Sequence, residues 1–245
     1  YLTIISSTFG IIGNILVFIV YSSKKFRQYS FSIYFRAMAI SDIFIVLHGY
    51  RQYSRFVHDS FIDLVSDFLC KMGDFSVYTT CSISVWILAL IAFDRLISVV
   101  YNQKLDFIKS KWFQLGSLGS IIVLSVCIYL PMPIYFNLIT DSSHNNETNL
   151  TETVKICILD ESKVSLVYWI DLINISIVTL ILNNILTIVL IIFLIKTRRK
   201  IHMNSERKRT TVWRDRKFAI NSIALNIFSF LFKSPVSFVL IVSSY

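Results

Sequence analysis

Six long apolar segments determine what this chain can fold into. They cover Leu2–Ser22, Phe31–Gly49, Met72–Phe93, Phe113–Ile134, Leu166–Ile195 and Phe218–Ser243. Each is close to the ~20 residues that an α-helix needs to cross the hydrocarbon core of a membrane. Charged residues make up only 16% of the chain, whereas a soluble domain usually carries about a quarter. The sequence therefore predicts an all-α, polytopic membrane protein.

The charged residues between these segments predict which side of the membrane each connection occupies. Lysine and arginine gather after the first, third and fifth segments, at Lys24, Lys25, Arg27, Lys104, Lys109, Lys111 and within 196–217. Because short basic connections are cytoplasmic, we predict a multi-pass plasma-membrane protein with an extracellular amino terminus. The net charge of +9 then reflects topology and attraction to anionic membrane lipids, and we do not expect a nucleic-acid partner.

Two further features agree with this topology. Asn146 and Asn149 begin glycosylation acceptor triplets in the polar connection between the fourth and fifth segments, and we predict that both carry glycans. Asn174 begins a third triplet, but it lies inside the fifth segment, where no glycan could attach. Cys70 and Cys157 also fall on the predicted extracellular side, where disulfides persist.

Short motifs inside the segments narrow the class of protein. In chain order they are Gly13-Asn14, Ala39-Ile40-Ser41-Asp42, Cys70, Ser84, Asp94-Arg95, Pro131, Cys157 and Pro235. In kind, order and spacing these residues resemble those of rhodopsin-like (class A) G-protein-coupled receptors. The resemblance covers all six segments and implies the seven-transmembrane receptor bundle of that family.

The six segments form one expected domain. With their polar ends, the predicted spans of the single transmembrane domain 1–245 are residues 1–22, 31–49, 70–100, 112–134, 165–196 and 217–243. The sequence begins at Tyr1 rather than at a methionine, and it ends at Tyr245 as the sixth span closes. We interpret it as a fragment that lacks the seventh helix and both tails.

Arg95 is the residue that the resemblance connects to signalling. In the family, the matching arginine is held by the preceding aspartate, here Asp94, and by an acid at the foot of the sixth helix. On activation it contacts the carboxy-terminal helix of the G protein. Asp215, 20 residues before Pro235, is either that second acid or a solvated charge in a basic connection. Pro235 should kink the sixth segment, at the position of the family's activation hinge.

Polar residues at mid-membrane depth form a second candidate site, because an ionisable group there is costly without a partner. The resemblance implies that Asn14 and Asp42 hydrogen-bond across the first two helices and that Asp42 binds sodium with Ser84. A purely structural role for Asp42 is the alternative. Lys233 replaces the family's usual tryptophan beneath the ligand. We hypothesise that it reaches Asp42 in place of sodium; otherwise it points to Asp74 or to an acidic ligand.

The extracellular half is the expected ligand site. Cys70 and Cys157 resemble the disulfide that joins the third helix to the second extracellular loop, and the long loop before Cys157 looks like the hairpin of peptide receptors. Val77 stands where amine receptors place an aspartate, which disfavours an amine ligand, while acidic outer loops favour a cationic peptide. Family positions give as candidate pocket residues Gln52, Tyr53, Asp74, Val77, Tyr78, Cys81, Lys233 and Ser237, for which helix packing is the alternative role.

These observations predict a neuropeptide-receptor-like protein that transmits binding of an extracellular ligand, expected to be a peptide, to a heterotrimeric G protein. A truncated or decayed relative without signalling is the alternative, because Lys233 departs from the family pattern. A six-span transporter or channel subunit is less favoured, because the sequence contains no internal repeat. The histidines are scattered, so we predict no enzymatic activity, and we expect no cofactor and no metal centre.

Overall fold

The computed structural model describes residues 2–29, 31–58, 66–100, 107, 110–145, 150–174, 179–201, 220 and 224. Near some element ends it describes only the backbone. The elements are α1 (Leu2–Ser22), α2 (Lys24–Arg27), α3 (Ser32–His58), α4 (Asp67–Val100), α6 (Lys111–Tyr129), α7 (Met132–Tyr135), β1 (Phe136–Asn145), β2 (Leu150–Leu159), α8 (Glu161–Asp171) and α9 (Thr179–Ile201). Asn146, Asn149, Asp215, Lys233, Pro235 and Ser237 lie outside the described residues.

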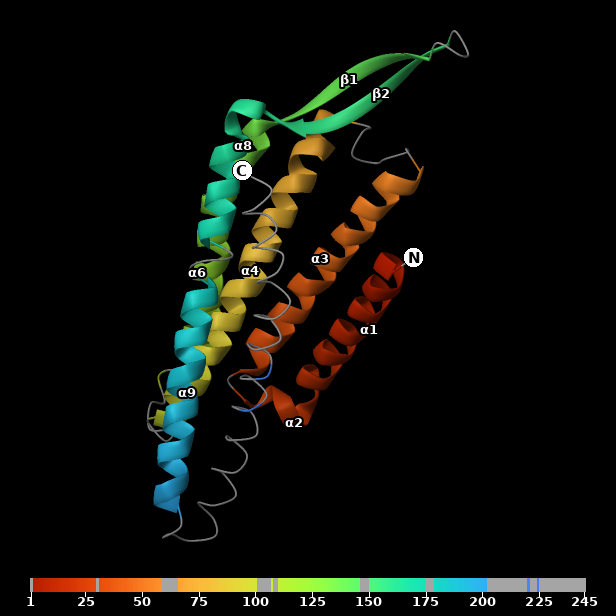
Figure 1. The fold of residues 1–245 in the computed structure, drawn as a ribbon. Coiled ribbons are helices and arrows are strands. Elements are labelled where there is room, and N and C mark those ends of the chain that lie inside the picture. Colours follow the sequence, from red (N-terminus) through yellow and green to blue (C-terminus); the bar gives the residue numbers. More distant parts are fainter. Residues whose placement is uncertain are drawn as a thin grey trace.

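The long helices run side by side and alternate in direction (Figure 1). The β1–β2 hairpin projects from the end of the bundle where α4 and α8 begin, and α2 lies at the opposite end. Among the described residues, Ser32–Gly49, Asp67–Ser98 and Lys111–Tyr135 are long and apolar enough to cross a membrane, and Ser7–Ser22 and Ile181–Phe193 are shorter apolar stretches. This architecture agrees with the predicted all-α membrane bundle.

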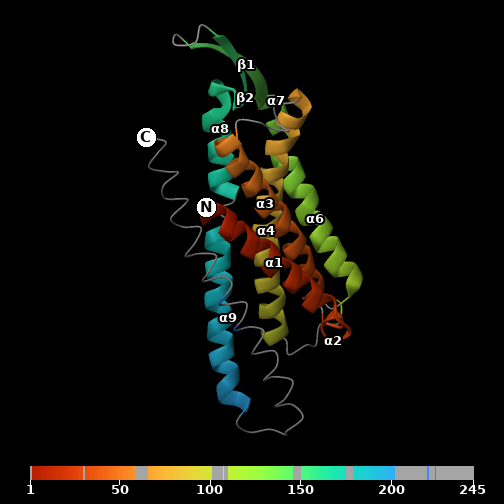
Figure 2. The ribbon, with the colours of Figure 1, turned by 90° about the vertical axis from the view of Figure 1, so that its right-hand side faces the viewer.

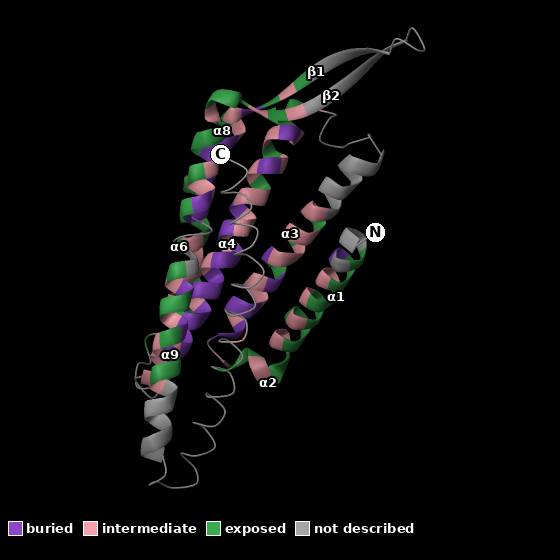
Figure 3. Cartoon of the chain, viewed as in Figure 1, coloured by how far each residue is buried: buried purple, intermediate pink, exposed green. Residues whose placement is uncertain are grey.

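Helix α4 forms the centre of the bundle. It contacts α3, α6 and α9, and the second view places α6 and α9 on its two sides (Figure 2). Ile87 and Ile91 on its inward side are completely buried, whereas much of α1 is exposed (Figure 3). A residue on α4 is therefore in reach of most other helices.

The outer surface of the bundle is apolar. Large side chains such as Phe9 on α1, Val123 on α6 and Ile188 on α9 are exposed, as is the thiol of Cys127 on α6. Contiguous apolar surface of this extent is unfavourable in water but is solvated by lipid chains. The buried and exposed faces therefore have the arrangement expected of helices surrounded by lipid.

Local sequence determines where several elements end or meet. Helix α6 stops before Pro131, which lacks the N–H needed to continue the ladder. Helix α8 is capped by the preceding Asp160, whose carboxylate accepts hydrogen bonds from the Ser162 hydroxyl (2.8 Å) and backbone N–H (2.9 Å). These bonds lower the pKa of the Asp160 carboxyl. On α1, a β-carbon at Gly10 would lie 3.1 Å from Val46, so glycine allows α1 and α3 to approach closely.

Candidate functional site

The Asp94–Arg95 pair lies near the last turns of α4, at the α2 end of the bundle. Arg95 donates a hydrogen bond to the Asp94 carboxylate through Nη2. Both residues are buried, with 4% of Arg95 and 3% of Asp94 exposed. Burial of this kind makes a charge costly unless it is paired. The arrangement therefore keeps the guanidinium of Arg95 next to Asp94 and away from the surface.

An aromatic ring covers the same guanidinium. The Cζ atom of Arg95 lies 4.2 Å from the centroid of the Phe31 ring, at the start of α3. This distance is within the range of a cation–π interaction. Phe31 is not among the residues predicted from the sequence, although several aromatic residues lie between Tyr29 and Phe35, next to a basic connection.

The mid-membrane polar residues are brought together only in part. The Ser84 hydroxyl on α4 donates to the Asp42 carboxylate on α3, so these two predicted partners do meet. In the described part of the chain, the Asn14 amide donates to the Gly10 carbonyl, 2.9 Å away on its own helix. Carboxylate and hydroxyl oxygens are ligands that hard cations accept, so Asp42 and Ser84 fit two positions of the sodium site that the family resemblance implies.

At the opposite end of α4, the predicted disulfide between Cys70 and Cys157 is present, with the two Cα atoms 5.7 Å apart. It connects α4 to the hairpin, whose strands pair from Phe136 opposite Leu159 to Asn145 opposite Leu150. Asp74 packs against the bridge, with Oδ2 3.6 Å from the Cys157 sulfur. Because a disulfide sulfur carries no hydrogen, we interpret this as packing rather than a hydrogen bond.

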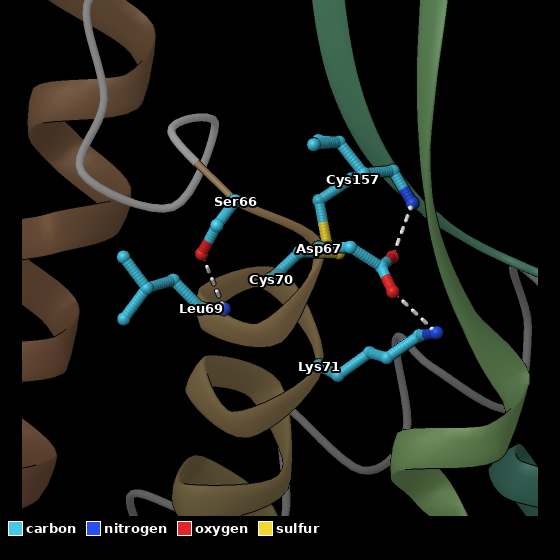
Figure 4. Close-up of polar contacts among 7 residues, drawn as sticks. Ser66, Asp67, Leu69, Cys70, Lys71 and Cys157 are labelled. Atoms are coloured by element: carbon cyan, nitrogen blue, oxygen red, sulfur yellow. Dashed lines mark hydrogen bonds and ion pairs between the residues drawn. A yellow bond between two sulfur atoms is a disulfide. The ribbon is translucent and has the colours of Figure 1, made fainter.

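A polar connection accompanies the disulfide (Figure 4). The Asp67 carboxylate accepts a hydrogen bond of 3.3 Å from the backbone N–H of Leu138 on β1. It also forms an ion pair of 2.6 Å with Lys71, one turn further along α4. The hairpin is therefore attached to the end of α4 at both of its strands.

The candidate pocket residues have different surroundings. Val77 lines a cavity of about 260 Å³ between α3 and α4, together with Phe44, Ile45, Leu47, His48, Ser76 and Thr80. Asp74 is buried, Tyr78 stacks on Tyr129 at 5.8 Å between ring centroids, and Cys81 is partly buried. Gln52 and Tyr53 lie on α3, and their side chains, like Ser237, are outside the described set.

A polar network joins α4, α6 and the turn that follows α8, and no role for its residues was predicted from the sequence. Its central residue is Asn174, whose amide nitrogen donates to Ser82 (3.0 Å) and to the Tyr129 hydroxyl (3.2 Å). The Trp86 indole donates to the Asn174 oxygen at 3.0 Å, and Tyr129 donates to Asp171 at 3.0 Å. Residues 172–174 form a π-helical turn, a feature frequent at functional sites. An asparagine inside an apolar segment was the available indication.

Comparison with known proteins identifies the family. The model of the family described as 7 transmembrane receptor (rhodopsin family) matches residues 13–245. The chain belongs to this family, which confirms the predicted fold class and a receptor rather than an enzyme. Apelin receptor A from Danio rerio is similar to the chain, with 26% identity over 160 residues. That match covers 64% of this chain and 41% of the relative, so it spans less than half of the relative's length.

Proposed function

We propose that this protein is a G-protein-coupled receptor of the plasma membrane that transmits binding of an extracellular peptide to a cytoplasmic heterotrimeric G protein. The observation that carries the proposal is the buried Asp94–Arg95 pair at one end of α4, with the disulfide-linked hairpin at the other. Helix α4 thus connects the hairpin, on which a ligand can bind, to Arg95, which a G protein can bind. A ligand that binds one conformation better than another shifts the population between them.

The two ends of the bundle support one orientation in the membrane. The Cys70–Cys157 disulfide requires an oxidising compartment, so the hairpin end faces outside. Lys24, Lys25 and Arg27 lie on α2 at the opposite end, where basic residues favour the cytoplasm and anionic lipid headgroups. This orientation makes the amino terminus extracellular and exposes the predicted glycosylation sites, Asn146 and Asn149, to the compartment in which glycans are added.

The hairpin and its charges support a peptide ligand. A two-stranded hairpin at the mouth of the bundle offers an extended surface on which a peptide can lie. Exposed carboxylates at this end, on Asp67, Asp160 and Glu161, attract a cationic ligand by electrostatic steering. The zebrafish relative is by its name a receptor for apelin. We therefore place the ligand at the mouth of the bundle, with the cavity of Val77 between α3 and α4 as part of its site and with Asp74 and Tyr78 as further proposed wall residues.

For coupling, Arg95 must leave its buried position and meet the G protein. Asp215 is the proposed second partner that holds it in the resting state, and Pro235 is the proposed hinge of the sixth helix. Lys233 is proposed to pair with Asp42 in the place of sodium. A strong effect of sodium on agonist affinity in the wild type would contradict the pairing of Lys233 with Asp42.

The direct test is Arg95→Ala in the full-length protein, with Arg27→Ala on α2 as the matched control. Cells would be stimulated with apelin and with a panel of basic peptides while nucleotide exchange on G proteins is measured. We expect Arg95→Ala to reduce stimulated exchange at least tenfold (~1.4 kcal/mol) at unchanged surface expression, and Arg27→Ala to retain it. Undiminished exchange in Arg95→Ala would contradict the role of this residue.

A receptor relative without signalling is the second candidate function. The observation that favours it is Lys233 in place of the family's usual tryptophan. This alternative predicts normal surface expression with no exchange above background for any peptide and any G protein. It further predicts that Lys233→Trp restores a response.

A further inference from the structure

The environment of Arg95 leaves its hydrogen-bonding capacity incompletely used. The guanidinium has five N–H donors, and Nη2 donates to the Asp94 carboxylate. Its Nε is buried and has no hydrogen-bond acceptor among the described residues. The Phe31 ring covers the guanidinium and attracts its positive charge. The ring cannot, however, accept a hydrogen bond of normal strength. The contact of Arg95 with the Phe31 ring could therefore be replaced by a hydrogen bond to a stronger acceptor.

The Phe31 ring is itself held firmly by an aromatic cluster, which we define as Tyr21, Tyr29, Phe31 and Phe35. Phe31 stacks on Tyr29 with centroids 5.4 Å apart, and it meets Tyr21 and Phe35 edge to face at 6.1 and 6.0 Å. Tyr21 stacks on Phe35 at 4.4 Å. These arrangements are the favourable ones for aromatic pairs. Because the cluster joins α1 to the start of α3, the ring cannot move far without separating two helices.

The backbone at the start of α3 adds to this restraint. The Ser32 hydroxyl donates to the Tyr21 carbonyl at 2.5 Å, so it connects the end of α1 to the residue after Phe31. The Ser32 N–H donates to the Tyr29 carbonyl at 3.1 Å. Phe31 is only 2% exposed. The position of its ring over Arg95 is therefore defined by both side-chain and main-chain contacts.

We propose that Phe31 is a positioning residue for Arg95: its ring holds the guanidinium against Asp94 and out of reach of the G protein. The inference rests on the proposed function. When Arg95 is released, its contact with the Phe31 ring is replaced by a hydrogen bond to an acceptor on the G protein. The unused Nε donor of Arg95 favours this replacement. A desolvated cation–π contact shifts such an equilibrium by roughly tenfold or more, so loss of the ring should raise signalling without agonist.

The first test measures agonist-free nucleotide exchange. Membranes containing the full-length protein would be mixed with purified G-protein heterotrimers and a non-hydrolysable GTP analogue. Phe31→Leu removes the ring but keeps apolar bulk, and we expect it to raise the basal rate about tenfold. Phe31→Tyr keeps the ring and should remain near the wild-type rate. Phe113→Leu on α6 is the matched control, because the Phe113 ring packs on Phe107, 5.0 Å between centroids, outside the cluster; it should change the rate less than about twofold.

The second test needs no G protein. Thermal unfolding of the detergent-solubilised full-length protein would be followed for Phe31→Leu, Arg95→Leu and the double variant. If the two side chains interact, the decrease in Tm of the double variant should be smaller than the sum of the two single decreases. The pair Phe113→Leu and Arg95→Leu should give additive decreases, because Phe113 packs on Phe107 outside the cluster.

The two tests separate failure of the inference from failure of the proposed function. Additive changes in Tm for Phe31 and Arg95, or equal activation by Phe31→Leu and Phe31→Tyr, would overturn the positioning role. So would an unchanged basal rate in Phe31→Leu when Arg95→Ala reduces exchange. If Arg95→Ala leaves exchange unaffected while the changes in Tm are non-additive, the contact stands and the proposed G-protein function is wrong.

Discussion

The two ends of α4 are stabilised by different kinds of interaction. At the hairpin end, a covalent bridge from Cys70 attaches the helix to the second strand. A hydrogen bond from the Leu138 N–H to the exposed Asp67 carboxylate, which also pairs with Lys71, attaches it to the first strand. At the α2 end, Asp94, Arg95 and Phe31 are held by burial and by contacts that can be exchanged. A fixed end suits a ligand site that must keep its shape, and an exchangeable end suits a site that must change its partner.

The largest expected effect comes from the fixed end. Cys70→Ala should lower the free energy of unfolding by about 4 kcal/mol, because the bridge closes a loop over a sequence separation of 87 residues. Thermal unfolding of the detergent-solubilised protein, with and without reductant, measures the change. Cys127→Ala, at the exposed thiol on α6, is the control and should behave as the wild type. A stable, reductant-insensitive Cys70→Ala would show that the hairpin is not fixed by the bridge.

The exchangeable end should respond to loss of charge. Asp94→Asn leaves Arg95 buried without its anionic partner, at an expected cost of about 3 kcal/mol in the free energy of unfolding. The same thermal measurement detects the loss. Raising the salt concentration should leave it unchanged, because the pair is shielded from solvent. A cost below about 1 kcal/mol would mean that the buried pair contributes no more than a surface one.

The polar network around Asn174 lies between the two ends of α4. A substitution in it shows whether the network connects them. Asn174→Ala should cost about 2 kcal/mol, because it leaves the buried Ser82 hydroxyl and the Trp86 indole with one partner fewer. Hydrogen exchange of the π-helical turn would report the loss locally, and thermal unfolding would report it globally. Asn137→Ala, at an exposed residue of β1, is the control. Unaltered hydrogen exchange in Asn174→Ala would show that the network is not a structural connection between the two ends.

The smallest effect is expected for Asp67→Asn. Its ion pair with Lys71 is exposed to solvent, and surface pairs contribute little. We expect the Tm of Asp67→Asn to lie within about 2 °C of the wild-type Tm, since 1 kcal/mol corresponds to a few degrees in a chain of this size. The same Asp→Asn substitution at positions 67 and 94 thus compares the two ends directly. Equal decreases in Tm would contradict the distinction between them.

The sequence predicted the helices well, because hydropathy and motif spacing are local properties. The first apolar segment coincides with α1, and the family motifs identified Asp94, Arg95 and the disulfide partners. Hydropathy, however, identifies the part of a helix that lies within the membrane and not the full length of the helix. The predicted span ended at residue 49, whereas α3 continues to His58 through polar residues that favour a helix as readily.

The contacts between distant segments were not predictable in the same way. Phe31 meets Arg95 across 64 residues of sequence, and that meeting depends on how α3 and α4 are rotated about their axes. Asn174 reached three partners for the same reason. The proposed roles of Asp215, Lys233, Pro235 and Ser237 stay predictions, because they concern residues outside the described part of the chain.

The pairing of Leu138 with Cys157 on neighbouring strands has a consequence for biosynthesis. A slip of one residue in β2 would turn Cys157 to the other face of the hairpin, away from Cys70. Closure of the bridge therefore reports that the strands have paired correctly. The fraction of newly made molecules in which Cys70 still reacts with an alkylating reagent is a measure of misfolded hairpin, and the measurement requires no ligand.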